Sequence, residues 1–220
     1  MLPSRLSAVQ ARVLTVLSTG RGEWVLTGGA ALVGFHTRHR VTRDLDLSWR
    51  SRVEIGDARD HVIDLLTGAG MQLEVLQTSP AFLRLPVTDD NETVVVDLVA
   101  EPVAAIEPPM QVAFGALTIR LDSPHEILVN KLCTLVQRSE LRDLIDVAAL
   151  LEHGGDLNRA LRDAPRKDAG FSPLTLIWLL REMPVLALSL ASGESNALSR
   201  DRVEFRDRLI ALVAAAAHNG

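Results

Sequence analysis

The sequence contains one cysteine, no apolar run of membrane-spanning length and no excess of positive charge, and each lack excludes a class of protein. The single thiol, Cys133, excludes an internal disulfide framework and a cysteine-rich zinc site. Its place in an apolar helical pattern indicates a buried thiol rather than a nucleophile. The longest apolar candidates, such as residues 209–217, are too short to span a bilayer, so no membrane partner is expected. The N-terminal residues lack the continuous apolar core of a signal peptide, which predicts a cytoplasmic location.

The net charge of −5 argues against a protein that grips nucleic acid over a long surface, because such surfaces are usually basic. Any contact with RNA must therefore come from a local patch of positive charge. Hydrophobic residues make up 47% of the chain, which excludes a disordered protein. A chain of 220 residues can bury a real core, as one domain or as two small ones.

The most informative stretch is residues 24–49, WVLTGGAALVGFHTRHRVTRDLDLSW. A short apolar strand is followed by Gly28 and Gly29, and then by an apolar helical segment from Ala30 to about residue 35. A glycine pair lets a phosphate approach the backbone, and the N-terminus of a following helix favours an anion. This pattern is consistent with a phosphate site, although a glycine pair after a strand is by itself more often a tight turn.

Two carboxylates follow on the next predicted strand. After a basic loop that contains Arg40, the strand carries Asp44 and Asp46, whose side chains share one face because side chains alternate along a strand. Neighbouring carboxylates repel each other unless a cation lies between them, and hard oxygen ligands suit magnesium. A solvated strand face is the ordinary explanation of such a pair. A phosphate site beside a metal-binding pair is instead what transfer from a nucleoside triphosphate requires.

The order of strand, Gly-Gly, helix and Asp-Leu-Asp-Leu resembles the signature of the DNA polymerase β-like nucleotidyltransferases. The basic residues before Asp-Leu-Asp-Leu narrow the resemblance to the AbiEii-type toxins of type IV toxin–antitoxin systems, which include the MenT-type tRNA nucleotidyltransferases. The segment between Gly29 and Asp44 is slightly longer than usual in that family. The resemblance implies two magnesium ions held by Asp44 and Asp46, with Gly28 and Gly29 at the β- and γ-phosphates.

Asp97 interrupts the otherwise apolar run TVVVDLV, residues 93–99. A carboxylate within such a strand needs a partner, because burying an unpaired charge is costly. It is either a structural residue paired with an arginine or a third metal ligand and general base beside Asp44 and Asp46. The resemblance favours the second reading, because polymerase β-like enzymes place their third carboxylate on such a strand.

The remaining patterns predict the other elements of the fold. Helices are expected over residues 4–18, with Ser4 as N-cap, and over residues 57–67. Residues 71–77 and 81–87 read as a strand pair, and residues 111–114 and 116–121 as a small hairpin. From Ser123 onward the chain reads as helical, with predicted helices at 124–137, 140–152, 157–163, 173–182 and 201–217.

A second constellation consists of Lys131, Arg138, Arg142, Asp143 and Asp146. The steps of 7 and 4 between the three cations put them on one side if the helix is nearly continuous, and Arg142 can pair with Asp146 four residues on. A salt-bridged exposed helix explains this spacing. The segment also resembles the Lys, Arg, Arg-Asp and Asp segment of the AbiEii-type toxins. That resemblance implies that Lys131 meets the triphosphate and that the Arg-Asp and Asp residues shape the nucleotide site.

Together these features predict an α+β protein with a polymerase β-like nucleotidyltransferase domain, a short mixed sheet flanked by helices, over residues 1–122. A helical C-terminal domain is expected over residues 123–220, with the active site between the two. The expected activity is magnesium-dependent transfer of a nucleoside monophosphate from a triphosphate. Asp44, Asp46, Asp97 and Lys131 are the predicted catalytic residues, and Arg40 helps to neutralise the phosphates. His36 and His39 are expected to be loop or packing residues.

The acceptor and the biological role follow from the resemblance alone. It implies the 3′ end of a tRNA as acceptor, growth arrest as outcome and a separately encoded antitoxin as protein partner. A small-molecule nucleotidyltransferase of the antibiotic-modifying kind would need the same metal and phosphate residues, and a non-catalytic nucleotide-binding module would share many of them. A glycosyltransferase would leave Gly28, Gly29, Asp97 and Lys131 unexplained. The segment GGAALVG lacks the glycine spacing of a dinucleotide site.

Overall fold

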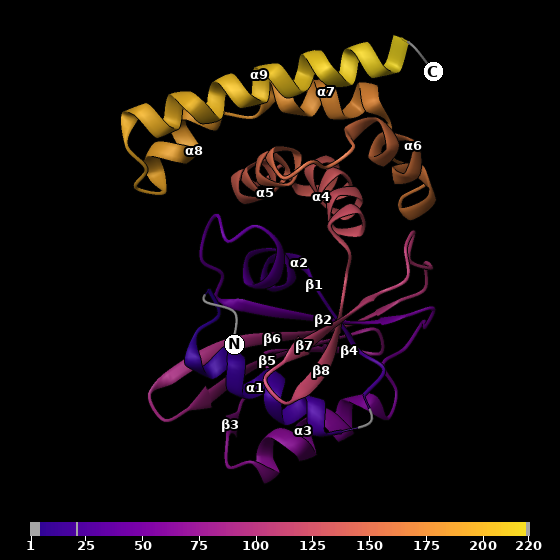
Figure 1. Cartoon of the computed structure of the whole chain (residues 1–220), viewed down its shortest axis with the longest axis vertical. Helices are drawn as coiled ribbons and strands as arrows, with labels where there is room; N and C mark the ends of the chain where they lie inside the picture. The colour runs from indigo at the N-terminus through magenta and orange to yellow at the C-terminus, as the bar shows by residue number, and fades with distance from the viewer. Residues whose placement is uncertain (1–4, 21, 219–220) are drawn as a thin grey trace. The chain divides into compact units, whose positions relative to one another are not determined.

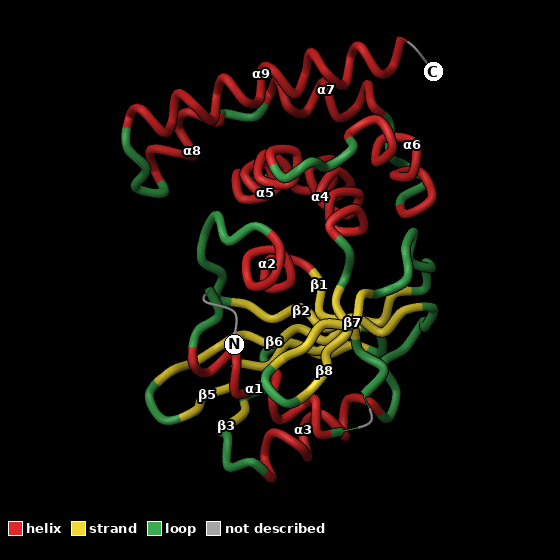
Figure 2. Tube along the Cα trace, viewed as in Figure 1, coloured by secondary structure: helices red, strands yellow, loops and turns green. Residues whose placement is uncertain are grey.

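The computed structural model describes residues 5–20 and 22–218, and the chain divides into two compact units, Met1–Ser123 and Pro124–Gly220. The first unit contains a mixed sheet with helices, and the second is built from helices (Figure 1 and Figure 2). The predicted fold class, a mixed sheet flanked by helices and followed by a helical part, is confirmed.

The first unit is organised by one mixed sheet, of eight strands within the described residues. Its strand order is β3-β5-β6-β2-β1-β8-β7, with β4 paired to β5. Strand β2 is parallel to β6, and β1 is parallel to β8, whereas the other pairs are antiparallel. The strand bounds are β1 Val25–Thr27, β2 Asp44–Arg50, β3 Gln72–Leu73, β4 Gln77–Ser79, β5 Phe82–Asp89, β6 Glu92–Glu101, β7 Met110–Phe114 and β8 Leu117–Leu121.

Helices α1 (Ala8–Thr19) and α3 (Ala58–Gly68) cover one side of this sheet, and α2 (Gly28–Ala31) lies on the other (Figure 2). The covered side of β2 presents Leu45, Leu47 and Trp49, which are buried, because the alternation of the strand turns its apolar residues together. The acidic residues of β2 therefore lie on the side of α2.

Helix α1 begins later than predicted. Ser7 is its N-cap: the Ser7 hydroxyl accepts from the Gln10 backbone N–H, and the Gln10 side chain accepts from the Ser7 N–H. This reciprocal capping satisfies two backbone donors at the start of the helix. The predicted N-cap, Ser4, lies outside the described residues.

Residues 71–77 do not form the single strand that their alternation predicts. Strand β3 pairs Leu73 with Val87, whereas β4 pairs Gln77 with Arg84, so four steps along one chain face three along the other. The extra residue is a bulge between β3 and β4, which interrupts the ladder although the Leu76 N–H still donates to the Arg84 carbonyl at 3.0 Å. Alternation cannot reveal a bulge, because it reports only which residues are apolar.

The second unit differs from its predicted helices mainly at their ends. Helix α6 runs on through Pro165, α9 begins earlier than expected, and the short helix α8 was not predicted. The helix bounds are α4 Pro124–Arg138, α5 Leu141–Glu152, α6 Leu157–Lys167, α7 Pro173–Glu182, α8 Val185–Ala191 and α9 Asn196–His218. Cys133 on α4 is buried, as predicted, and burial raises the pKa of its thiol to about 11.

Within the described residues, no single helix is long and apolar enough to cross a membrane. Helices α7 and α8, which are bent by 59° at the break between them, reach that length and hydropathy only when taken together.

Candidate active site

A row of four side chains in register crosses strands β1, β2, β6 and β5, and it contains the predicted carboxylates Asp46 and Asp97. Asp46 on β2 is in register with Thr27 on β1 and with Asp97 on β6, and Asp97 is in register with Arg84 on β5. Residues in register on neighbouring strands point to the same side of the sheet, with strands about 4.8 Å apart. Asp44 lies on the same face as Asp46, two residues earlier in β2. The structure therefore brings Asp44, Asp46 and Asp97 to one face of the sheet.

The glycine pair lies directly against this row. Gly28 has φ +61°, and a Cβ atom at this position would lie 2.3 Å from Oδ2 of Asp46. A Cβ on Gly29 would lie 3.0 Å both from an Arg40 guanidinium nitrogen and from the Thr42 hydroxyl. Only glycine fits at position 28 without displacing the Asp46 carboxylate, because the backbone conformation and the close approach both exclude a side chain.

The helical segment begins earlier than predicted, at the glycines themselves, and it is less regular. Helix α2 begins at Gly28 itself and continues as a π-helical turn, η1 (Leu32–His36). The Thr37 N–H donates to the Leu32 carbonyl at 2.9 Å, which closes the wider turn. A π-turn takes in one more residue than an α-turn, so it accommodates extra length between Gly29 and Asp44.

Asp97 is buried and is held by Arg84. The Arg84 Nε donates to Asp97 Oδ1 at 2.8 Å, and its Nη2 donates to Oδ2 at 2.6 Å, which is a bidentate ion pair. These hydrogen bonds raise the pKa of Arg84 despite partial burial, and the negative charges of Asp97, Asp44 and Asp46 add to the effect. The sequence offered pairing with an arginine as the structural explanation of Asp97. That arginine is present on the neighbouring strand, β5.

The family resemblance implies a magnesium ion at these carboxylates. Asp44 and Asp46 supply half-buried carboxylate oxygens on one face, and these suit a hard cation. In the described part of the chain, however, no three acidic, histidine or cysteine side chains are grouped closely enough to hold a metal ion together. Asp97 is turned to Arg84, so Asp44 and Asp46 fit a cation, and Asp97 fits as a third ligand only after leaving Arg84.

A buried polar cluster beside the row was missed by sequence reasoning. Asp122, only 1% exposed, follows β8 and accepts from the Thr27 hydroxyl and from Arg50, both at 2.5 Å. Thr27 is the register neighbour of Asp46, so its hydrogen bond to Asp122 holds the side chain next to Asp46 in place. The alternating polar residues of β2, which include Ser48 and Arg50, were the signal in the sequence. Its partner Asp122, which follows β8, had no such signal in the sequence.

The two histidines after the glycines take part in packing, as predicted. The ring Nε2 of His36 lies 2.9 Å from the Asp122 carbonyl oxygen, and the ring Nδ1 of His39 lies 2.6 Å from the Thr37 hydroxyl. Burial lowers the pKa of His36, although the hydrogen bond and the charge of Asp122 oppose the shift. A neutral His36 therefore donates from Nε2 to the Asp122 carbonyl.

The second constellation forms a buried ion-pair network in the helical unit. Lys131 Nζ lies 2.7 Å from Asp143 Oδ1 and 2.7 Å from Asp146 Oδ2, and both carboxylates are fully buried. Arg138 also donates to Asp143, at 2.8 and 3.1 Å. Burial alone would raise the pKa of Asp143, but the hydrogen bonds and charges of Arg138 and Lys131 outweigh it, so this pKa is lowered.

The predicted helices 124–137 and 140–152 are separate, as expected: the chain breaks between α4 and α5 at Ser139, which has φ +49°. The nearly continuous helix that would put the three cations on one side is therefore not formed. Arg142 donates to Glu140 at 2.6 Å, and Asp146 pairs with Lys131. The break lets α5 turn its acidic residues toward α4. Contacts of Lys131, Arg142, Asp143 and Asp146 with a nucleotide stay a prediction.

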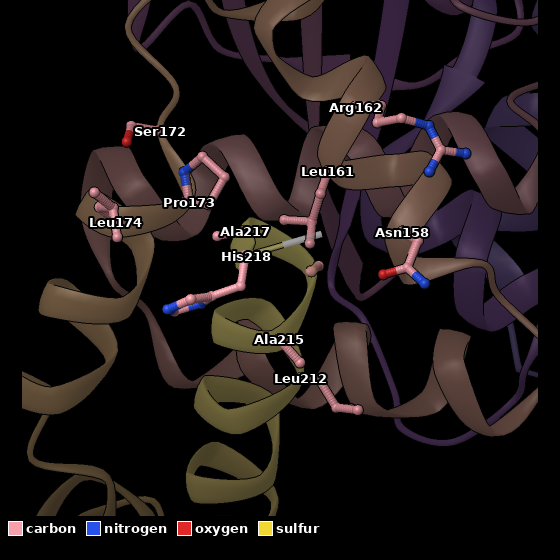
Figure 3. Close-up of a pocket in the computed structure, with 11 residues that line it drawn as sticks. Asn158, Leu161, Arg162, Ser172, Pro173, Leu174, Leu212, Ala215, Ala217 and His218 are labelled. Carbon is pink, nitrogen blue, oxygen red and sulfur yellow. The ribbon is translucent and has the colours of Figure 1, made fainter. Parts of the chain in front are cut away.

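Neither of two further cavities contains a predicted site residue. A groove of about 830 Å³ in the helical unit lies among α6, α7 and the end of α9, and is lined by Leu161, Leu174, Leu212 and other mostly apolar residues (Figure 3). A cavity of about 320 Å³ in the first unit is lined by Trp24 and Trp49, on the sheet face opposite the carboxylates. The candidate active site is therefore carried by the carboxylate row and not by these cavities.

Comparison with known proteins supports the same assignment. The sequence model of the family described as "Nucleotidyl transferase AbiEii toxin, Type IV TA system" matches residues 12–216. Among solved structures, the fold is similar to MenT4, a nucleotidyltransferase toxin of Mycobacterium tuberculosis H37Rv, with a TM-score of 0.60 and 18% identity over 95% of this chain and 85% of that one. JHP933 from Helicobacter pylori gives a TM-score of 0.55 and 18% identity over 96% of this chain and 92% of that one. No curated protein matches the sequence significantly. The family predicted from the motifs is confirmed: the chain belongs to the AbiEii nucleotidyl transferase toxins and is a nucleotidyltransferase.

Proposed function

We propose that this nucleotidyltransferase transfers a nucleoside monophosphate from a triphosphate to the 3′ end of a tRNA, in a magnesium-dependent reaction. The observation that supports this most directly is that Asp44, Asp46 and Asp97 lie on one face of the sheet, with Gly28 against the Asp46 carboxylate. This arrangement supports the proposal, because the residues assigned to metal and the glycines assigned to phosphate lie next to each other. Transfer of a phosphoryl group depends mainly on such positioning and charge neutralisation.

In this proposal each residue has a defined task. Asp44 and Asp46 hold two magnesium ions, and Asp97 joins them as a third carboxylate. The metal ions, when bound, stabilise charge on the attacking and leaving oxygens. Gly28 and Gly29 leave room for the β- and γ-phosphates beside the sheet. Arg40, whose guanidinium lies near Gly29, contributes positive charge there.

The chemical step exchanges one P–O bond for another and transfers one proton. The 3′-hydroxyl oxygen of the acceptor attacks the α-phosphorus, and the bond from that phosphorus to the bridging oxygen of the β-phosphate breaks. Pyrophosphate leaves with the bonding electrons, and Asp97 accepts the hydroxyl proton. Lys131 is assigned to the triphosphate, and Arg142, Asp143 and Asp146 to the nucleotide site.

The biological part of the proposal follows the family. A toxin of a type IV system is expected to have a separately encoded antitoxin as partner, and the family description supports this. We propose action in the cytoplasm, where triphosphates and tRNA are both present. The excess of acidic residues, with a net charge of −5, restricts RNA contact to a local area such as the acceptor end.

The test is incubation of the purified full chain with each α-³²P-labelled triphosphate, magnesium and total RNA. Label should move to RNA of tRNA size, and periodate oxidation of the RNA beforehand should abolish it by destroying the 3′-terminal diol. Asp46→Ala should give no label, whereas Asp64→Ala, which removes an exposed carboxylate from α3, should label normally. Label on small molecules but not on RNA would reject the tRNA acceptor.

A further inference from the structure

Arg84 and Asp97 differ in how far their side chains are exposed to solvent. The Arg84 side chain is 43% exposed, whereas the Asp97 side chain is 8% exposed. A buried carboxylate needs a counter-charge at all times, because an unpaired charge away from water is unfavourable. An exposed guanidinium can leave for solvent without that penalty. Arg84 is therefore the member of the pair that can move.

Asp97 lies between two positions of opposite character. Its register neighbour on strand β5 is Arg84. Its register neighbour on strand β2, at the other edge of β6, is Asp46. Each neighbour is about one strand spacing away, roughly 4.8 Å. A change of side-chain rotamer moves the Asp97 carboxylate from the first neighbour toward the second. The same carboxylate cannot give both oxygens to Arg84 and also serve a cation beside Asp46.

The released guanidinium has a second contact nearby. The Cζ atom of Arg84 lies 5.6 Å from the ring centroid of Phe82, two residues earlier on the same face of β5. A cation within about 6 Å of an aromatic ring is attracted to its face. Phe82 therefore keeps Arg84 close to the site when its bonds to Asp97 are broken.

We propose that Arg84 is the resident counter-cation of Asp97 and is displaced when a divalent cation binds at Asp44 and Asp46. Arg84 is then a positioning residue that acts through Asp97. It holds the Asp97 carboxylate in place when no metal is bound. It also sets the metal concentration at which Asp97 becomes a metal ligand. This inference rests on the magnesium site of the proposed function.

The test is metal binding to the full chain, measured by isothermal titration with Mn²⁺ in the absence of nucleotide, with thermal unfolding as a second readout. Arg84→Gln should bind Mn²⁺ about tenfold more tightly, because a unit positive charge close to a divalent ion is removed. In EDTA the same variant should melt at a lower temperature than the parent, since Asp97 has lost its counter-charge. Added metal should raise its melting temperature by more than that of the parent.

Two further variants serve as control and as check. Arg12→Gln removes a positive charge from the same unit, at the Arg12–Asp89 pair, and should leave Mn²⁺ affinity unchanged. Arg84→Lys keeps the charge but loses the bidentate geometry, so its affinity should lie between those of the parent and Arg84→Gln. This variant also tests the inference if Arg84→Gln does not fold.

The possible failures are distinguishable. If the parent binds Mn²⁺ and transfers nucleotide, but Arg84→Gln and Arg84→Lys bind Mn²⁺ no more tightly, Arg84 is a structural partner and the inference is overturned. If the parent neither binds Mn²⁺ nor transfers nucleotide with magnesium, the metal site of the proposed function fails, and the inference falls with it.

Discussion

Gly28 and Asp46 are in such close contact that a methyl group on the glycine would lie 2.3 Å from the carboxylate oxygen. The contact joins the end of β1 to the centre of β2, and it links the predicted phosphate site to the predicted metal site. We expect Gly28→Ala to abolish nucleotide transfer, since the new Cβ must push Asp46 out of the row. The strained positive φ should also cost about 1 kcal/mol of stability.

Gly115→Ala is the matched control for this substitution. Gly115 also has a positive φ, of +63°, but nothing lies within 4 Å of its Cβ position. It should lose similar stability in thermal unfolding while retaining transfer activity. Normal activity in Gly28→Ala would show that this close contact is not needed at the site.

Asp44→Ala and Asp46→Ala should each abolish transfer while the protein remains folded, because both side chains are half-buried at a sheet surface and not part of the core. Each substitution also removes one of several neighbouring negative charges, so the melting temperature in EDTA should be unchanged or higher. Circular dichroism and the RNA-labelling assay measure the two effects. Full activity in either variant would rule out the two-metal assignment.

Asp97→Asn should leave triphosphate binding near normal and reduce transfer about a hundredfold or more, the usual contribution of a general base. The substitution keeps the size of the side chain but weakens its hold on Arg84, so a small loss of stability is expected. Single-turnover transfer and equilibrium binding of a labelled triphosphate separate the two quantities. Equal transfer rates in parent and variant would make Asp97 a structural strand residue.

Lys131→Ala should destabilise the helical unit by about 3–5 kcal/mol, because Asp143 and Asp146 would be left buried without that counter-charge. The exposed pair Arg142–Glu140 should contribute only about 0–1 kcal/mol, so Arg142→Ala is the control. Urea unfolding measures both. A Lys131 variant with unchanged stability would contradict the buried network, and unchanged triphosphate affinity would remove Lys131 from the nucleotide site.

The pKa of His36 predicts a loss of stability in mild acid. Burial lowers this pKa in the folded protein, so the unfolded chain takes up the proton first as the pH falls below about 6.5. The unfolded state then binds more protons, and the free energy of unfolding decreases as the pH falls toward the lowered pKa. His36→Gln should flatten this dependence in unfolding experiments between pH 7.5 and 5.

The sequence by itself determined the type and order of most elements and the family. Alternation in β2 placed Asp44 and Asp46 on one face. Gly28 and Gly29 indicated a place where the backbone is open to close approach because it carries no side chain. These signals are local: each depends on residues a few positions apart, where chain geometry alone dictates which side chains share a face. The family motifs are local in the same sense, which is why the assignment needed no coordinates.

The tertiary structure decided which distant residues meet. Arg84 reaches Asp97 only through the antiparallel register of β5 and β6, and Asp122 reaches Thr27 only because β8 runs beside β1. The bulge between β3 and β4 likewise depends on which strand these residues pair with. Hydrogen-bond register and the pairing of buried charges are settled between segments far apart in the chain. For that reason Lys131 proved to be the buried partner of Asp143 and Asp146, and not one member of an exposed basic helix face.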